Sequence, residues 1–139
     1  IEIVKRNMST MVGIVSGALD VLNKYGVSIE HLPSGIDSFN VVVNKKDVEH
    51  SLAEILSEIN QAIAPDSIRV PEPIALIAVV GSNMNARVGS SAKLFGALAE
   101  ANVNIRMISQ GSSEIDIIVG VSQQDFSKAV QALYNTFTK

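Results

Sequence analysis

The chain has 139 residues, of which 47% are hydrophobic and 18% are charged, enough to build the core of one domain or of two small ones. Its net charge of -3 argues against a nucleic-acid or anionic-membrane partner, and the absence of Cys excludes disulfides, thiolate metal sites and a Cys nucleophile. The longest strongly apolar run, Ile74–Val80, is far shorter than the ~20 residues of a membrane helix, and no signal-peptide pattern opens the chain. We therefore expect a cytoplasmic protein, and the first residue, Ile rather than Met, indicates a piece of a longer one.

The first half of the chain predicts the element order β-α-β-β-α-β, which is that of the ferredoxin-like split unit. Strands are expected over residues 1–5, 27–31, 38–44 and 68–70, and helices over residues 13–25 and from about residue 47. Gly26 ends the first helix because glycine readily adopts the left-handed cap conformation, and Pro65 stops the second. The predicted apolar stripe of the second helix comprises Val48, Leu52, Ile55, Leu56, Ile59 and Ile63.

The second half of the chain predicts the same order without a last strand. Strands are expected over residues 74–81, 103–109 and 114–120, and helices over residues 89–101 and from residue 122 onward. Ser122 with Asp125 resembles a capping box at the start of the last helix. The predicted buried stripe of that helix is Phe126, Ala129, Val130, Leu133 and Phe137. This half either folds with three strands or takes a fourth from sequence upstream of residue 1, and we favour the second because an open sheet edge invites aggregation.

An internal repeat relates the two halves. At an offset of 76 residues, Asn7-Met8 aligns with Asn83-Met84 and Val12-Gly13 aligns with Val88-Gly89 without a gap, and Asn102 takes the place of Gly26. Such paired residues make chance matching of common aliphatic residues an unlikely explanation. We therefore predict an α+β fold of two ferredoxin-like β-α-β-β-α-β units in tandem, over residues 1–71 and 72–139, with the second lacking its last strand.

Residue patterns typical of catalysis are missing. The two histidines, His31 and His50, have no further ligands spaced to complete a metal site. Residues 81–91 lack the Gly-Lys-Ser/Thr ending of a phosphate-binding loop, and no nucleophile elbow or His-bearing triad pattern occurs. Aromatic residues make up only 4%, too few for the base-stacking strands of an RNA-recognition domain. The sequence indicates a binding or regulatory module that has no catalytic residue, metal or cofactor of its own.

Two features could bind a small ligand. The helices expected after Gly13 and Gly89 present free N–H groups and the positive end of the helix dipole, which favour a carboxylate, although a tight turn alone also explains a glycine there. Glu30 on the second strand corresponds to Arg106 in the second copy, and a carboxylate there could pair with an ammonium group. Such a site would hold both ends of an amino acid. An exposed strand charge, or a Glu30–Arg106 pair between the units, is the alternative that the residues alone favour.

The run at residues 104–117 closely resembles the C-terminal regulatory region of aspartokinases. That family shows an N-I-x-M-I-S-Q-G-S-S-E-x-x-I run, preceded by V-G-x-x-M and a Gly-led helix, which residues 80–84 and Gly89 match. The resemblance covers the whole chain, because that region is a tandem of two ACT domains. Residues 30–37 of the first copy, E-H-L-P-S-G-I-D, resemble a subgroup of bacterial aspartokinases and depart from the T-S-E run of lysine-sensitive ones.

The resemblance implies a parent enzyme, an aspartate kinase, that phosphorylates the side-chain carboxylate of aspartate at the first step toward lysine, threonine and methionine. Its kinase domain, with ATP and Mg, would lie upstream of residue 1, and the first ACT unit would be inserted within the second. The implied partners are an amino-acid effector (lysine or threonine), the protein's own kinase domain and a second copy in a homodimer. The effector site carried over by position comprises Met8, Met11, Gly13, Ile14, Val15, Glu30, Ser34 and Gly35. The alternative is an ACT-type dimerisation module that senses no ligand.

Overall fold

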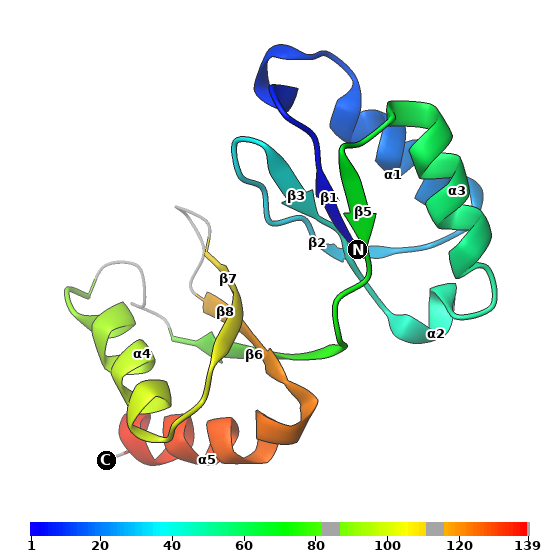
Figure 1. Ribbon diagram of the computed structural model, residues 1–139. Coiled ribbons are helices and arrows are strands. Elements are labelled where there is room, and N and C mark those ends of the chain that lie inside the picture. The colour runs from blue at the N-terminus through cyan, green and yellow to red at the C-terminus, as the bar shows by residue number, and fades with distance from the viewer. Residues whose placement is uncertain (82–86, 111–115, 139) are drawn as a thin grey trace. The chain divides into compact units, whose positions relative to one another are not determined.

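The structure, a computed structural model, describes residues 1–81, 87–110 and 116–138 (Figure 1). The chain splits into two compact units, unit 1 over Ile1–Pro71 and unit 2 over Glu72–Lys139. Asn83-Met84 and residues 111–114, which carry part of the repeat and of the aspartokinase-like run, lie outside the described residues. No helix in the described ranges is long and apolar enough to cross a membrane.

Unit 1 contains the predicted β-α-β-β-α-β order with two of its elements divided. Its strands are β1 (Glu2–Val4), β2 (Ile29–His31), β3 (Ser38–Asn40), β4 (Val42–Val43) and β5 (Ser67–Arg69). Its helices are the 3-10 turn η1 (Met8–Thr10), α1 (Ile14–Lys24), α2 (Lys45–Val48) and α3 (Leu52–Ile63).

The strand predicted over residues 38–44 is interrupted at Val41, which separates β3 from β4. β3 pairs with β1, which also pairs with β5, while β4 pairs with β2, and all these pairings are antiparallel. The Val41 amide donates to the Ile1 carbonyl at 2.8 Å and the Ile1 amino group donates back to the Val41 carbonyl at 3.0 Å, which continues the ladder across the break. The resulting order β5-β1-β3/β4-β2 is the ferredoxin-like order and confirms the predicted fold class.

The core of unit 1 lies between one face of this sheet and helices α1 and α3 (Figure 1). Ile3 and Phe39, directly paired across β1 and β3, are fully buried, as is Leu22 of α1. Helices α1 and α3 pack closely, since a Cβ atom on Gly17 would come within 2.7 Å of Ile63. The apolar spacing that predicted these helices therefore marks the face that each one buries.

The second predicted helix begins earlier than expected and is broken. Asn44 caps α2, because its side-chain oxygen accepts a hydrogen bond from the Lys46 amide at 3.0 Å, and this starts the helix two residues before the predicted position. The chain then leaves the helix at residues 49–51 before α3 begins. Of the predicted stripe, Val48, Ile55, Ile59 and Ile63 are buried, whereas Leu52 and Leu56 are half-buried.

Unit 2 has a three-stranded antiparallel sheet in the order β6-β8-β7. Its elements are β6 (Ile74–Val80), α4 (Ser90–Glu100), β7 (Ile105–Ser109), β8 (Asp116–Ser122), the 3-10 turn η2 (Gln123–Asp125) and α5 (Phe126–Phe137). Its core is formed by Leu94 and Leu98 of α4, by alternate residues of β8 and by Ala129 and Leu133 of α5. Within the described residues this unit has no counterpart of β5, as predicted.

The prediction for the start and the buried face of the last helix was wrong in part. The Ser122 side chain makes no capping bond, and a 3-10 turn precedes α5, so there is no capping box. Phe126 and Val130 are 43% and 40% exposed, because the face of α5 that turns toward the sheet is the one carrying Ala129 and Leu133. Phe137, also predicted to be buried, packs at the edge of that core.

The predicted helix ends are confirmed in both units. Gly26 follows α1 with φ of 69°, and Asn102 follows α4 with φ of 55°. In both cases the next backbone amide donates back to the last helical turn, at 3.0 and 2.9 Å. Glycine and asparagine are the residues that tolerate this left-handed conformation best, so the repeat conserves a backbone geometry through two different side chains.

Candidate functional site

The loop between β1 and α1 carries the first group of predicted site residues. Asn7 adopts a left-handed conformation with φ of 59°, and the chain then makes the short turn η1, which begins at Met8. The turn is closed by the Thr10 hydroxyl, which donates to the Asn7 carbonyl at 2.8 Å, and by the Met11 amide, which donates to the Met8 carbonyl at 3.1 Å. The loop is therefore a folded structure and leads directly to the helix.

The N-terminus of α1 is open to a ligand. Gly13 precedes the helix with φ of 86°, and no side chain caps the first turn, in which Ile14 and Val15 are half-buried. The first amides of a helix lack intrahelical partners and sit at the positive end of its dipole. Val12 is fully exposed and Met11 is 45% exposed beside them. This combination of free amides and exposed apolar side chains suits a ligand with a carboxylate and an aliphatic part.

The turn between β2 and β3 carries the second group of predicted residues. The Gly35 amide donates to the Ser38 carbonyl at 2.7 Å, and the Ser34 hydroxyl donates to the Leu32 carbonyl at 3.2 Å. Ser34 also forms an isolated bridge with Phe39, whose side chain is in the core. The turn is thus anchored on the sheet, and its position is fixed by the core beneath it.

Asp37 joins these two segments. Its backbone carbonyl accepts a hydrogen bond from the Lys5 amide at 2.9 Å, and its carboxylate accepts one from the Asn7 amide at 3.0 Å. The segment that holds Met8, Met11 and Gly13 is therefore linked directly to the turn that holds Ser34 and Gly35. Sequence reasoning missed Asp37, although an Asp in a Ser- and Gly-bearing turn is a known acceptor for nearby backbone amides.

Glu30 lies at a β-bulge of the edge strand β2. Ile29 faces Val43 while His31 faces Val42, so the register shifts at Glu30, whose side chain is exposed. A bulge redirects the side chain that it carries, and bulges are frequent beside functional sites. Regular alternation is therefore lost along this strand, and Ile29 is itself 38% exposed.

The same bulge occurs in unit 2. Ile105 faces Val121 while Met107 faces Gly120, so the register shifts at Arg106, the residue that the repeat pairs with Glu30. The two units thus share a backbone irregularity at one position and place opposite charges on it. No described residue of unit 1 hydrogen-bonds the Glu30 side chain, so the structure does not link Glu30 to the loop as it links Ser34 and Gly35.

An ionic cluster holds the other end of α1. The Tyr25 hydroxyl donates to a Glu58 carboxylate oxygen at 2.7 Å, and the Lys24 ammonium donates to both oxygens at 3.1 and 3.0 Å. The hydrogen bond from the Tyr25 hydroxyl is the main cause that lowers the pKa of Glu58, and the bond from Lys24 is the next. The Tyr25–Glu58 bond also raises the pKa of Tyr25. This cluster fastens α1 to α3 and is structural, because every member is already partnered.

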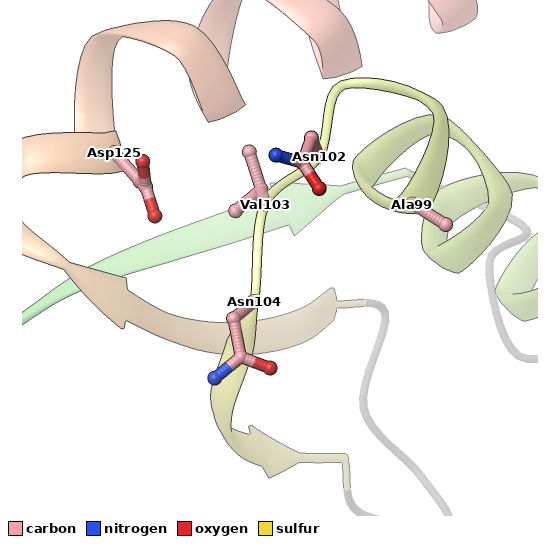
Figure 2. A pocket seen from close by; sticks show the side chains of 5 residues that line it. All are labelled: Ala99, Asn102, Val103, Asn104 and Asp125. Atoms are coloured by element: carbon pink, nitrogen blue, oxygen red, sulfur yellow. The ribbon is translucent and has the colours of Figure 1, made fainter.

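A shallow recess of about 420 Å³ lies in unit 2, lined by Ala99, Asn102, Val103, Asn104 and Asp125 (Figure 2). It is at the C-terminal end of α4, the opposite end from Gly89, and so does not correspond to the predicted site. The Lys128 ammonium donates to the Asn102 carbonyl at 3.1 Å and pairs with Asp125 at 3.1 Å. A cation at a helix C-terminus is a stabilising arrangement, and we interpret the recess as part of it.

In residues 1–81, 87–110 and 116–138, no three His, Cys, Asp or Glu side chains are grouped so that they could hold a metal ion. His50 is exposed and lies 3.5 Å from its neighbour Glu49. The two segments joined by Asp37 bring an uncapped helix N-terminus together with exposed apolar side chains, an arrangement suited to a carboxylate.

Comparison with known proteins places this arrangement in a family. Residues 77–137 match the ACT domain. Aspartokinase 3 of Bacillus subtilis (strain 168) is 38% identical over 138 residues, which cover 99% of this chain and 30% of that protein. The structure of the Clostridium acetobutylicum aspartate kinase, described as an allosteric enzyme, matches with a TM-score of 0.94 and 45% identity over 98% of this chain and 31% of that one.

A further match covers most of a shorter chain. A structure of aspartokinase α and β subunits matches with a TM-score of 0.83 and 26% identity, covering 99% of this chain and 90% of that one. The chain spans less than a third of the Bacillus and Clostridium proteins but nearly all of this shorter chain. The resemblance seen in the sequence is confirmed: residues 77–137 match the ACT domain, and aspartokinases match this chain over nearly its whole length.

Proposed function

We propose that this chain is the part of an aspartate kinase that binds an end-product amino acid, lysine or threonine, and thereby inhibits the ATP-dependent phosphorylation of aspartate. The observation that carries the proposal is the uncapped N-terminus of α1, set where the β1–α1 loop and the β2–β3 turn are hydrogen-bonded together. The matches to the ACT domain and to an aspartate kinase described as an allosteric enzyme agree with this role.

The effector carboxylate is placed at the first amides of α1, after Gly13. No side chain caps the first amides of this helix, and the missing Cβ of Gly13 lets a ligand approach the backbone. The side chain of the effector would contact Met8 and Met11, whose flexible thioethers adapt to aliphatic ligands, with Ile14 and Val15 forming the base. Ser34 and Gly35 would border the site from the neighbouring turn.

The effector ammonium group is assigned to Glu30. Its bulged position on β2 redirects the carboxylate relative to a regular strand, and it is exposed rather than held in a described ion pair of unit 1. Arg106 at the equivalent position of unit 2 would repel an ammonium group. We therefore place the amino-acid site in unit 1 and give unit 2 a structural and coupling role.

The remaining partners are those of the whole protein. The kinase domain that the family membership implies would bind ATP and Mg, and it would be the target of the inhibition. We further propose a homodimer. β2 and β7 are edge strands, each paired on one side only among the described residues, and pairing of such edges between two chains would satisfy their free backbone groups.

A thermal-shift screen of the full-length protein against the twenty amino acids tests the proposal. A ligand of the native state raises the melting temperature by mass action, so lysine or threonine should raise it and also inhibit aspartate phosphorylation. The second candidate, a dimerisation module without ligand sensing, predicts no shift with any amino acid. Light scattering on the same sample tests the dimer, and a monomer at high micromolar concentration contradicts it.

A further inference from the structure

Two carboxylates from distant parts of unit 1 hold consecutive amides of the β1–α1 loop. The Asp66 carboxylate accepts a hydrogen bond from the Arg6 amide at 2.6 Å, and the Asp37 carboxylate accepts one from the Asn7 amide at 3.0 Å. Asp66 lies in the connection between α3 and β5, whereas Asp37 lies in the turn before β3. The loop is thus bonded from two elements, neither of which is adjacent to it in sequence.

The same connections fix the chain on either side of these amides. The Asp66 amide donates to the Val4 carbonyl at 2.8 Å, and the Lys5 ammonium donates to the Ala64 carbonyl at 2.7 Å. The Lys5 amide donates to the Asp37 carbonyl at 2.9 Å. Asp37 therefore bonds the loop through both its backbone and its side chain, and Asp66 bonds the end of β1 through its backbone and the loop through its side chain, an arrangement that fixes orientation as well as distance.

These bonds immediately precede the left-handed Asn7 and the turn η1. Asparagine adopts this conformation more readily than other residues except glycine, and the bonds to the Arg6 and Asn7 amides hold it there. Charge-assisted bonds to carboxylates are the stronger class of hydrogen bond, and here they fall on the amide of Asn7 itself and on the one before it. The direction in which the chain leaves β1 toward Met8, Met11 and Gly13 is consequently set by Asp37 and Asp66.

We propose that Asp37 and Asp66 are positioning residues of the effector site, which hold the β1–α1 loop in its binding conformation before the ligand arrives. This inference rests on the proposed function, because it assigns a role within the same site. Neither residue touches the effector. Without them the loop must be ordered during binding, so the effector binds more weakly although its own contacts are intact.

The test uses the full-length protein with four variants: Asp37→Ala, Asp37→Asn, Asp66→Ala and, as the matched control, Asp20→Ala, which removes an exposed carboxylate from α1. Hydrogen exchange of the peptide over residues 5–12 is measured without ligand, and titration calorimetry measures affinity for L-lysine and L-threonine. We expect faster exchange and about tenfold weaker binding in the two Ala variants at positions 37 and 66. Asp37→Asn keeps an acceptor oxygen and should bind within about threefold of wild type.

The outcomes separate this inference from the proposed function. Faster exchange with unchanged affinity, or unchanged exchange in the Ala variants, overturns the positioning role while leaving the effector site in place. Equal weakening by Asp20→Ala overturns it too, because the effect would then follow net charge. If the wild-type protein binds neither amino acid, the proposed function fails, and the positioning role fails with it. If Asp37→Asn binds the effector as weakly as Asp37→Ala does, loss of the acceptor oxygen does not cause the weaker binding, and the inference is wrong.

Discussion

The two units of this chain share their backbone irregularities and differ in the side chains placed on them. Gly13 and Gly89 precede α1 and α4 with φ of 86° and 89°, and the valine before each glycine is fully exposed in both units. The β-bulge on the second strand also recurs, at Glu30 and Arg106. A feature present in both copies is what the fold requires, so the left-handed glycine alone does not indicate a ligand.

The differences are more informative about function. The bulge carries a negative charge in unit 1 and a positive charge in unit 2, which changes the charge of ligand that each unit can hold. Unit 1 has its fourth strand β5, and the connection into that strand supplies Asp66 to the loop. Two units with similar backbones can therefore differ in role, one carrying a binding site and the other serving as its structural partner.

The largest expected effect comes from Gly13→Asp compared with Gly89→Asp. Both glycines have similar positive φ and neither lacks room for a Cβ, so both substitutions should cost about 1 kcal/mol of stability through backbone strain. Only Gly13→Asp puts a negative charge at the proposed carboxylate site. It should weaken inhibition by lysine or threonine more than about hundredfold without reducing uninhibited kinase activity.

Inhibition curves and melts of both variants make this measurement. If Gly89→Asp relieves inhibition as strongly as Gly13→Asp, the two units do not differ in the way proposed. If inhibition is unchanged in Gly13→Asp, the effector does not sit at the N-terminus of α1.

A smaller effect is expected from Glu30→Gln compared with Arg106→Gln. Glu30→Gln keeps the shape of the side chain and removes its charge, so the loss of one charge-assisted bond of roughly 1.5–3 kcal/mol should reduce effector affinity by about ten- to hundredfold. The melting temperature without ligand should hardly move. Arg106→Gln should leave the affinity unchanged.

The structural alternative is a Glu30–Arg106 pair between the units, and it predicts the opposite result. Both variants would then lower the melting temperature by similar amounts, and neither would act through the ligand. Titration calorimetry and a melt on each variant distinguish the two explanations, and unchanged affinity in Glu30→Gln removes Glu30 from the site.

The smallest expected effect concerns the Tyr25–Glu58 cluster, which unit 1 has and which unit 2 lacks because Ala101 stands at the position of Tyr25 in the repeat. The pKa of Glu58 is lowered in the folded state, so its contribution to stability is present above the ordinary glutamate pKa of about 4.3 and is lost as the pH falls through the folded value. Tyr25→Phe should therefore lower the melting temperature by a few degrees at pH 7 and by less at pH 3. An equal decrease at both pH values contradicts this coupling.

The fold could be predicted from the sequence because the apolar residues that indicate its elements recur at regular intervals. Helical spacing predicted α3 and α5, and the Gly26–Asn102 pair predicted the left-handed ends of α1 and α4. The failures occurred where a single side-chain bond decides the structure. Asn44 starts α2 early by capping it, and Ser122 does not cap although its sequence context is that of a cap.

The candidate site was only partly predictable for a related reason. Met8, Gly13, Ser34 and Gly35 could be chosen from the repeat and the family resemblance, and the structure places them on two bonded segments. Asp37 and Asp66 were missed: the turn around Asp37 suggested an acceptor but not its partner, because the two contacts span 30 and 60 residues of chain. The bulge at Glu30 was also missed, since a one-residue change of register leaves no periodic trace in a strand of three residues.

The central claim is that the effector binds unit 1 at the start of α1 and does not bind unit 2 at the start of α4. Hydrogen exchange of the full-length protein, with and without saturating lysine or threonine, tests this claim most directly. We predict that the effector slows exchange over residues 8–16 and over residues 34–37, and leaves residues 87–92 unchanged. Slowed exchange confined to residues 87–92, or no change in either region at a concentration that inhibits the kinase, would contradict it.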